Sequence, residues 1–508
     1  MHLSFAAARR AAVLVVFTAA FAVTLALTAS AQQPASPPAV PTPPSSQISP
    51  GSQGLSAQTS DQVAAIAQKV LAQTGVPSAS VGIVKNGKIV YTQAFGLARV
   101  APALPAQASM AYPIGSISKQ FTATAMLLLQ QQGKLCLEDP VSKFFPELTA
   151  SHQVRLINLL THTSGYQDYA PQDYTIPAWK LPGHPLRIVH EFAGKPLDFA
   201  PGTQWQYSNT NFVLAALIVQ KVSGEPFAKF LRDNVLRPAG LSGVLNLNTQ
   251  QRQLQVTGYM RYALAPITPA ALEAPGWYFG DADLAMTAGQ LLQWDLTLIN
   301  QSLLSPAGYQ EMETPFYLAD GHNSHYGLGV EVRQQDGRRV LEHSGEVGGF
   351  VAEDVVYPED RAAIVVLTNQ EASEAAGQIA RQIAPLILPA PPAATAASAN
   401  PALATAQAFA PQLQKILAGL QQGKIDRALF TADCNGYFDA AALGDYSSSL
   451  SPLGSLSAVT PSAAELRGGM TFGVYRAVFS GGTTAVITVY LEPDGKIEQL
   501  LVVGKAEK

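Results

Sequence analysis

The chain is poor in cysteine. Its 508 residues include only two, Cys136 and Cys434, which are too few for the disulfide framework that stabilises many small secreted domains. They fall in different predicted domains, so we expect no bridge between them, and we expect neither to be catalytic. Cys136 stands between Leu135 and Leu137, and we expect it to pack as a small apolar residue.

Charged residues are also scarce, at 13% of the chain, and the formal net charge is −4. Lysines and arginines are scattered rather than gathered in a stripe, which argues against a nucleic-acid partner. The acidic and histidine residues that stand close together, Asp281 with Asp283 and His322 with His325, do not have the spacing of metal ligands. The sequence therefore predicts neither a metal nor another cofactor.

The N-terminus, residues 1–31, has the pattern of a secretory signal peptide. Arg9 and Arg10 precede an apolar stretch over residues 11–27, and Ala29-Ser30-Ala31 is a small-residue cleavage site. The apolar stretch is short for a membrane span, so we expect cleavage and a secreted or periplasmic protein. The alternative is an uncleaved signal that anchors the chain in a membrane.

Composition divides the rest of the chain. Residues 32–59 are rich in Pro, Ser, Gln and Ala, which predicts a disordered linker. Residues 60–385 form the main predicted domain, residues 386–402 an Ala/Pro linker, and residues 403–508 a small α+β domain of unknown function. In that last domain we expect a helix over 406–422 and strands over 470–479, 485–491 and 497–503.

Local signals place several elements of the main domain. Ser60 is a predicted N-cap for a first helix, and Asn86-Gly87 predicts a hairpin between strands at 81–84 and 89–91. The apolar segment that follows Ser116 predicts a buried helix that stops at Gly133. Together these elements indicate a layered fold with a mostly antiparallel sheet.

The most informative pattern is Ser116-Ile117-Ser118-Lys119. On a helix, residues three apart project from one face, so the hydroxyl of Ser116 and the amine of Lys119 would form a nucleophile and an adjacent base. The alternative is that Ser116 only caps the helix. Two later triplets, Tyr207-Ser208-Asn209 and His343-Ser344-Gly345, favour catalysis instead.

These three motifs and their surroundings resemble the class C β-lactamase and penicillin-binding-protein-like serine hydrolases, a family with D-alanyl-D-alanine carboxypeptidase, D-aminopeptidase and esterase members. The resemblance runs from about residue 60 to about residue 369, and includes Tyr112-Pro113-Ile114-Gly115 before the nucleophile. It implies an α/β (α+β) β-lactamase/transpeptidase-like fold: an antiparallel sheet flanked by helices, plus an all-helical subdomain. His162 matches a framework segment of the family, so we expect it to be structural.

The resemblance also assigns roles. Ser116, Lys119 and Tyr207 would be catalytic, with Lys119 or Tyr207 as the base. The predicted substrate-binding residues are Asn209, His343, Ser344, Gly345 and Glu346, and the backbone N–H groups of Ser116 and Glu346 would form the oxyanion hole.

Two of these positions depart from the family pattern. His343 stands where class C β-lactamases usually have a lysine, and a histidine gives only a partial, pH-dependent charge. Glu346 stands where a small residue is more usual, and its carboxylate would narrow the acyl pocket or repel a substrate carboxylate. Both departures favour a peptidase or esterase over an efficient β-lactamase.

The sequence thus predicts a secreted serine hydrolase that works through an acyl-enzyme on Ser116. The expected substrates are peptidoglycan-type D-alanyl peptides, D-amino-acid amides or small esters. The alternatives are a true class C β-lactamase and a non-catalytic protein that binds or senses the cell wall. In either case the C-terminal domain would be available for a cell-wall or protein partner.

Overall fold

The computed structural model describes residues 54–335, 337–389, 401–467 and 470–505. The predicted signal peptide and most of the predicted linker 32–59 lie outside these residues. Within the described ranges, no helix combines the length and apolarity needed to cross a bilayer.

The main domain is built on a seven-stranded antiparallel sheet in the order β3-β2-β1-β12-β11-β10-β9. Its strands are β1 (Ser78–Lys85), β2 (Lys88–Arg99), β3 (Leu104–Pro105), β9 (Glu331–Gln335), β10 (Arg338–Val347), β11 (Phe350–Tyr357) and β12 (Ala362–Thr368). The predicted hairpin is confirmed, because Asn86 and Gly87 join β1 to β2 with positive φ angles of 52° and 69°.

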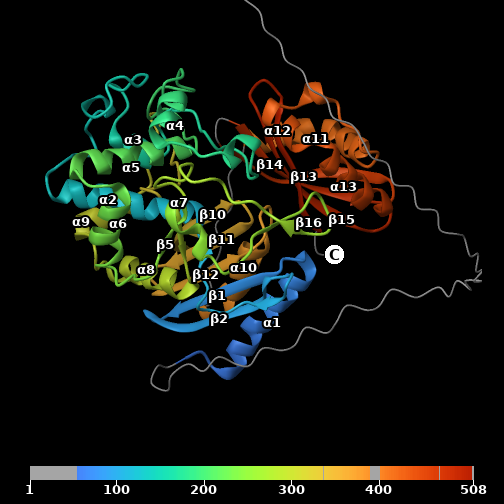
Figure 1. The fold of residues 1–508 in the computed structure, drawn as a ribbon, viewed down its shortest axis with the longest axis horizontal. Helices are drawn as coiled ribbons and strands as arrows, with labels where there is room; N and C mark the ends of the chain where they lie inside the picture. The colour runs from blue at the N-terminus through green and yellow to red at the C-terminus, as the bar shows by residue number, and fades with distance from the viewer. Residues whose placement is uncertain (1–53, 336, 390–400, 468–469, 506–508) are drawn as a thin grey trace, which may run out of the picture. The chain divides into compact units, whose positions relative to one another are not determined.

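Helices cover both faces of this sheet (Figure 1). On one face, α1 (Ala57–Thr74) and α10 (Ala375–Ile387) share a core with Ile364 and Val366 of β12. On the other face, α8 (Ala288–Asn300) belongs to the core that contains Val365 and Leu367. Successive side chains of a strand point to opposite faces, so a central strand covered on both sides must be apolar throughout.

Helix α1 begins earlier than predicted. Its N-cap is Ser56, whose Oγ accepts a hydrogen bond of 3.1 Å from the Thr59 amide, and the helix starts at Ala57. The prediction that Ser60 caps the helix was wrong, because Ser56 is an equally good capping residue and nothing in residues 57–59 stops a helix.

The helical subdomain packs around α5, which is buried along most of its length. Its helices are α2 (Ser118–Gln131), α3 (Leu156–Leu160), α4 (Pro185–Phe192), α5 (Asn209–Ser223), α6 (Phe227–Leu231) and α9 (Pro306–Met312). Helix α2 ends as predicted, with Gly133 in the left-handed conformation just beyond the C-cap.

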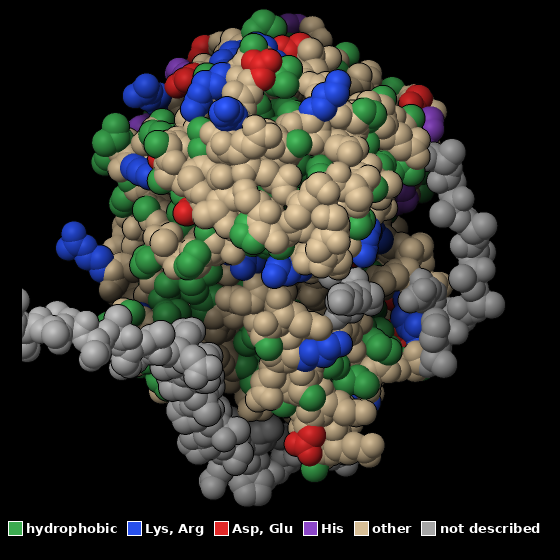
Figure 2. All heavy atoms as spheres, turned by 90° about the vertical axis from the view of Figure 1, so that its right-hand side faces the viewer, with side chains coloured by type: hydrophobic (Ala, Val, Ile, Leu, Met, Phe, Trp, Pro, Cys, Tyr) green, Lys and Arg blue, Asp and Glu red, His purple; other side chains and the backbone are tan. Residues whose placement is uncertain are grey.

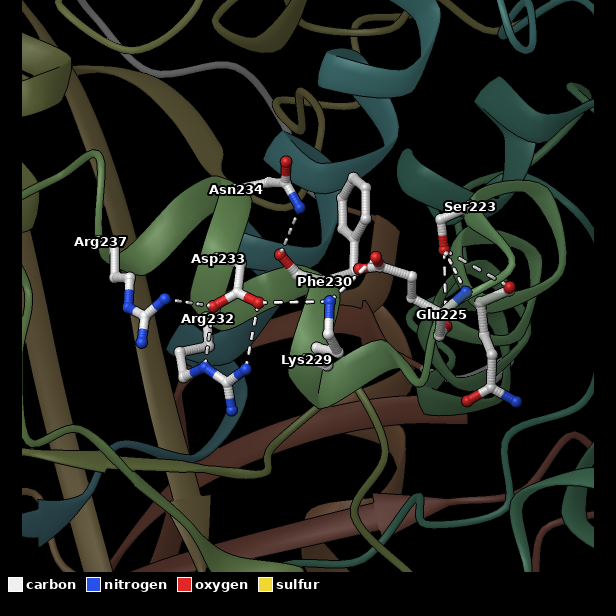
Figure 3. Close-up of polar contacts among 9 residues, drawn as sticks. Ser223, Glu225, Lys229, Phe230, Arg232, Asp233, Asn234 and Arg237 are labelled. Atoms are coloured by element: carbon white, nitrogen blue, oxygen red, sulfur yellow. Dashed lines mark hydrogen bonds and ion pairs between the residues drawn. The ribbon is translucent and has the colours of Figure 1, made fainter.

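A row of exposed ion pairs runs along α6 and the residues on either side of it (Figure 3). Lys229 lies 2.9 Å from a Glu225 carboxylate oxygen and 3.4 Å from one of Asp233, and Arg237 lies 2.8 Å from Asp233. Successive partners are four residues apart, and such solvent-exposed pairs add little to stability. The ion pairs therefore keep this face of the subdomain hydrated, and they do not determine the fold.

Short elements connect the sheet to the helical subdomain. They are the small sheet β4 (Tyr112–Pro113), β8 (Leu284–Met286) and β5 (Leu245–Asn246), the pair β6 (Tyr259–Met260) and β7 (Thr268–Pro269), and helix α7 (Leu247–Gln250). Strand β4 leads directly into the turn that carries Ser116, so this small sheet fixes where that turn begins.

The C-terminal domain is a four-stranded antiparallel sheet, β13-β14-β15-β16, with helices packed on it. Its elements are α11 (Pro401–Leu420), α12 (Ala432–Tyr437), α13 (Ala440–Leu450), β13 (Leu456–Arg467), β14 (Met470–Phe479), β15 (Thr484–Leu491) and β16 (Ile497–Lys505). The α+β class and the last three strands match the prediction. Helices α12 and α13 and strand β13 were not predicted, and α11 begins inside the predicted linker.

The two cysteines are both free thiols. Cys434 is buried in the C-terminal core, but Cys136 is exposed. The expectation that Cys136 packs as an apolar residue was therefore wrong. In the segment after α2, Leu135 and Leu137 point inward, and the residue between them faces solvent.

The C-terminal domain bonds directly to a loop of the main domain. The Asp173 amide donates to Gln499 Oε1 at 2.7 Å, and Gln499 Nε2 donates to Asp173 Oδ2 at 3.0 Å. The Tyr174 hydroxyl donates to the Glu498 carbonyl oxygen at 3.1 Å. Strand β16 thereby holds the loop that contains residues 168–175.

Candidate active site

Ser116 and Lys119 lie on one face of the chain, as the motif predicts. Ser116 belongs to a short 3-10 turn, Gly115–Ile117, and Lys119 to the first turn of α2. Lys119 Nζ is 2.9 Å from Ser116 Oγ. The predicted single helix is thus a 3-10 turn followed by an α-helix, and the spacing still brings hydroxyl and amine together.

Lys119 is completely buried, which is rare for a lysine. Its Nζ donates to Asn209 Oδ1 at 2.7 Å and to the Asp281 carbonyl oxygen at 3.1 Å, and it lies 4.9 Å from the centre of the Tyr207 ring. Burial without partners would be costly, so these contacts hold the amine in place. They also bring Tyr207 and Asn209, which are distant in sequence, to the nucleophile.

Asp168 fixes Asn209 from the other side. Its Oδ1 accepts from the Asn209 amide at 2.8 Å, and its Oδ2 accepts from Asn209 Nδ2 at 3.2 Å. Burial raises the pKa of Asp168 to about 6, and the hydrogen bonds and the charge of Lys119 oppose that rise. Asp168 was not predicted from the sequence, because no motif links it to Asn209, 41 residues away.

A second buried carboxylate lies beside Lys119. The side chain of Asp281 accepts from the Tyr169 hydroxyl at 2.7 Å and from the Phe279 amide at 2.8 Å. Burial raises the pKa of Asp281, and the Lys119 charge lowers it. These bonds position the Asp281 backbone oxygen that accepts from Lys119. The sequence presented Asp281 only as a possible metal ligand. In the structure, its side chain instead holds its own backbone oxygen in place for Lys119.

His162 has the kind of contact expected of a structural residue. It is fully buried, and its Nδ1 accepts a hydrogen bond of 3.1 Å from the Ser208 amide. Its ring centre lies 4.2 Å from that of Tyr207 and 4.8 Å from that of Tyr326. His162 therefore sets the backbone of the Tyr207-Ser208-Asn209 turn.

The triplet His343-Ser344-Gly345 lies in β10, beside the outer strand β9. His343 is buried, with Nε2 2.8 Å from the Tyr326 hydroxyl and Nδ1 against the Ser344 carbonyl oxygen. A carbonyl oxygen can only accept, so Nδ1 carries a proton, and a neutral ring satisfies both contacts by accepting the Tyr326 O–H at Nε2. Ser344 is exposed and lines the cleft.

Two glycines allow the nucleophile turn to press against β10. A Cβ on Gly345 would lie 1.9 Å from the Ile114 carbonyl oxygen, and one on Gly115 would lie 2.6 Å from the Glu346 amide nitrogen. Only glycine fits at either position. The close approach brings the backbone N–H of Glu346 to the turn that carries Ser116, which is the arrangement required for an oxyanion hole.

The chain matches the family model described as Beta-lactamase over residues 63–387. It belongs to the β-lactamase family. A protein of Bacillus subtilis (strain 168) named as a penicillin-binding protein is 28% identical over 306 residues, which are 60% of this chain and 74% of that protein. A D-aminopeptidase of Gluconobacter oxydans is 26% identical over 308 residues, and the match spans only 56% of its length.

A solved structure extends the likeness beyond the family domain. The octameric penicillin-binding protein homologue from Pyrococcus abyssi is 22% identical, with a TM-score of 0.58 over 88% of this chain and 99% of that one. At this identity the likeness concerns the fold alone. The β-lactamase/penicillin-binding-protein fold is thereby confirmed, and the chain is a serine hydrolase of that fold.

Ser116 of this β-lactamase-family hydrolase opens onto a cleft of about 1480 Å³. Tyr207, Asn209 and Ser344 line it, and so do Glu465 and Leu466 from β13 of the C-terminal domain. On the face that Figure 2 shows, Lys and Arg side chains appear in small separate groups. Among the described residues, no group of three or more His, Cys, Asp or Glu is placed to hold a metal ion.

Glu346 does not stand isolated in the cleft. Its Oε1 accepts a hydrogen bond of 2.6 Å from the Ala372 amide, in the segment after β12. The carboxylate is therefore held by the backbone of a neighbouring segment, while the residue still lines the cleft beside the oxyanion hole.

Proposed function

We propose that the protein hydrolyses amide or ester bonds through an acyl-enzyme on Ser116. The supporting observation is the placement of Lys119 Nζ, 2.9 Å from Ser116 Oγ and hydrogen-bonded to Asn209 Oδ1 and the Asp281 carbonyl oxygen. These two oxygens only accept, so each takes one N–H of Lys119. When the amine is deprotonated, its lone pair is then directed at the Ser116 hydroxyl.

In the first half of the reaction, Ser116 Oγ attacks the substrate carbonyl carbon and its proton passes to the Lys119 and Tyr207 pair. The carbonyl oxygen becomes an oxyanion held by the N–H groups of Ser116 and Glu346. Collapse of this intermediate forms the acyl-enzyme and expels the amine or alcohol, which takes up the proton. A water molecule then attacks the carbonyl carbon of the acyl-enzyme and gives up a proton to the Lys119 and Tyr207 pair. The ester bond to Ser116 breaks, Ser116 Oγ takes the proton back, and the acid is released.

For substrates we propose D-alanyl peptides, D-amino-acid amides or small esters, with β-lactams as slow substrates or covalent inhibitors. The names of the relatives support this range, and the buried His343 with both ring nitrogens engaged supports weak recognition of a substrate carboxylate. We also propose that the N-terminal signal directs the protein to the periplasm or the exterior.

The test is covalent labelling of the mature protein with a fluorescent penicillin and, separately, a fluorophosphonate, located by mass spectrometry. We expect Ser116 to be labelled, and Ser116→Ala to abolish the label. Ser118→Ala is the matched control, because Ser118 is buried two residues away and its Oγ accepts from the Leu284 amide. It should still be labelled.

The pattern of labelling separates the alternatives. Label from both reagents supports penicillin-recognising chemistry, and turnover of a cephalosporin would then identify a β-lactamase. Label from the phosphonate alone supports an esterase or amidase. No label from either reagent on a folded sample would overturn the catalytic proposal in favour of a binding or sensing protein.

A further inference from the structure

Strand β10 continues past its neighbour β9. Pairing with β9 ends at Glu342, whereas pairing with β11 continues to Val347. The loop between β10 and β11 has two residues, so Val347 and Phe350 form its hydrogen-bonded pair and the next pair, Glu346 and Val351, does not exchange backbone hydrogen bonds. The N–H and C=O of Glu346 therefore point toward the edge where Ser116 lies.

The N–H of Gly348 belongs to the two-residue turn after β10, at a residue that lines the same cleft as Ser116. It donates to Glu273 Oε2 at 3.3 Å, and the Thr175 hydroxyl donates to Glu273 Oε1 at 2.9 Å. Gly348 follows Glu346 by two residues, so their amide nitrogens lie at most about 7 Å apart. The carboxylate of Glu273 thus lies on the cleft wall near the Glu346 amide of the oxyanion hole.

A second carboxylate, that of Glu371, binds the next residue of the same turn. Glu371 Oε2 accepts from the Gly349 amide at 2.6 Å. Both Glu273 and Glu371 are more than nine-tenths buried and line the cleft. Neither has an ion-pair partner among the residues that the structure describes, although most of the buried charges in proteins are paired.

The surroundings of the two carboxylates are negative. Burial, with a smaller contribution from the charge of Asp281, raises the pKa of Glu273 to about 7 against the hydrogen bonds that lower it. Burial, with smaller contributions from the charges of Glu273 and Asp173, raises the pKa of Glu371 to about 8 against the Gly349 hydrogen bond. A cation placed among these groups would relieve this repulsion.

An independent feature, the side chain of Gln172, lacks a hydrogen-bond donor at the cleft. Gln172 is 6% exposed and lines the cleft next to Asp173, and its Oε1 accepts no hydrogen bond from any described residue. A buried amide oxygen without a donor is costly in free energy. Here the oxygen and the carboxylates are all acceptors, so a group with several hydrogen-bond donors, such as an ammonium, would satisfy them.

We propose that Glu273, Glu371 and Gln172 form a subsite for a free ammonium group on the acyl part of the substrate. The inference rests on the proposed function, since the acyl group is located by the Ser116 and Glu346 amides. An ammonium on the carbon next to the scissile carbonyl reaches the C=O of Glu346 and the carboxylate of Glu273. The preferred substrates are then amides, esters or peptides whose acyl residue has an unblocked amino group.

The test measures binding without turnover. In a Ser116→Ala background, calorimetry at pH 7 compares D-alaninamide with D-lactamide, in which a hydroxyl replaces the ammonium at nearly the same size. We expect D-alaninamide to bind about tenfold or more tightly, because hydrogen bonds to a charged group are the strong ones. The combined Glu273→Gln and Glu371→Gln substitutions keep shape and acceptors and should abolish the preference.

Glu498→Gln is the matched control, because Glu498 is a similarly buried carboxylate of the C-terminal domain that does not line the cleft. It should leave the preference unchanged. Equal affinities for the two amides, including no measurable binding of either, overturn the proposal, and so does a preference that survives the double substitution. Phosphonate labelling of Ser116 in the parent chain tests catalysis separately, so failure of the subsite and failure of the proposed function are distinguishable.

Discussion

Two neighbouring residues of α2, Lys119 and Gln120, lead into two different buried polar clusters. Successive residues of a helix are about 100° apart, so their side chains enter different regions of the interior. Lys119 contacts Ser116 and Asn209. Gln120 accepts from the Trp294 indole N–H at 2.8 Å and donates to Asp354 Oδ2 at 3.2 Å.

The two clusters differ in access rather than in burial. Ser116, Tyr207 and Asn209 line the cleft, so the Lys119 cluster can meet a substrate. Asp295 and Asp354 are almost completely buried, and neither lines that cleft. The carboxyl groups of Asp295 and Asp354 are hydrogen-bonded to each other. A perturbed, buried polar group thus marks a reactive site only where the fold also leaves a path to it.

The largest effect should come from breaking the accessible cluster at Lys119. Lys119→Met keeps the length of the side chain but removes the base, and should lower kcat/KM on the order of 10³-fold or more. Lys221→Met is the control, since Lys221 is an exposed lysine that donates to the Phe144 carbonyl and does not line the cleft. Equal losses in both variants would mean that the effect is structural.

Asp168 allows a sharper test of the same cluster. Asp168→Asn cannot accept both Asn209 N–H groups, so we expect kcat to fall roughly 10- to 100-fold through misplaced Asn209. In the parent chain, protonation of Asp168 would weaken the same bonds, so activity should fall as the pH drops through about 6, the raised pKa of that carboxyl. The variant should lack this acidic limb in its pH–rate profile, and an unchanged limb would contradict the assignment.

The smallest effect should come from the enclosed cluster and should concern stability. Burial raises the pKa of Asp354 to about 7 in the folded chain, well above its ordinary value, so folding favours the protonated form. The stability this provides is present at low pH and is lost as the pH rises through about 7. In Asp354→Asn, the fall in Tm between pH 5 and 8 should be smaller by roughly 2–4 °C.

The control for this experiment is Asp61→Asn, which changes an exposed carboxylate of α1. Its Tm should follow that of the parent chain across the same pH range. Activity at pH 8 should be retained in Asp354→Asn, because Asp354 does not line the cleft. An Asp354→Asn protein with the parent's pH dependence would show that the hydrogen-bonded pair of Asp354 and Asp295 does not titrate as a unit in this pH range.

Features that local sequence specifies were predictable. The Asn86-Gly87 hairpin, the stop at Gly133 and the proximity of Ser116 to Lys119 depend on residues within a few positions of one another. Strand β13 was missed because it is rich in Ser, Thr and Ala and contains Pro461, so its apolar alternation is weak.

The supporting residues of the site could not be predicted in this way. Asp168, Glu273 and Glu371 each accept from a backbone N–H far away in the sequence, at Asn209, Gly348 and Gly349. Every residue except proline has such an N–H, so no residue pattern signals the partner. The family motifs identified the side chains around Ser116, whereas only the folded backbone shows which carboxylates support the residues of the site.

The pairing of Asp173 with Gln499 has a consequence for how the protein matures. Gln499 lies in β16, far downstream of Ser116 in the chain, and it holds the same loop that supplies Asp168 to Asn209. A ribosome makes the nucleophile well before this strand. The catalytic loop therefore lacks this support until β16 has been made, so a chain truncated before β16 would carry Ser116 without a finished site around it.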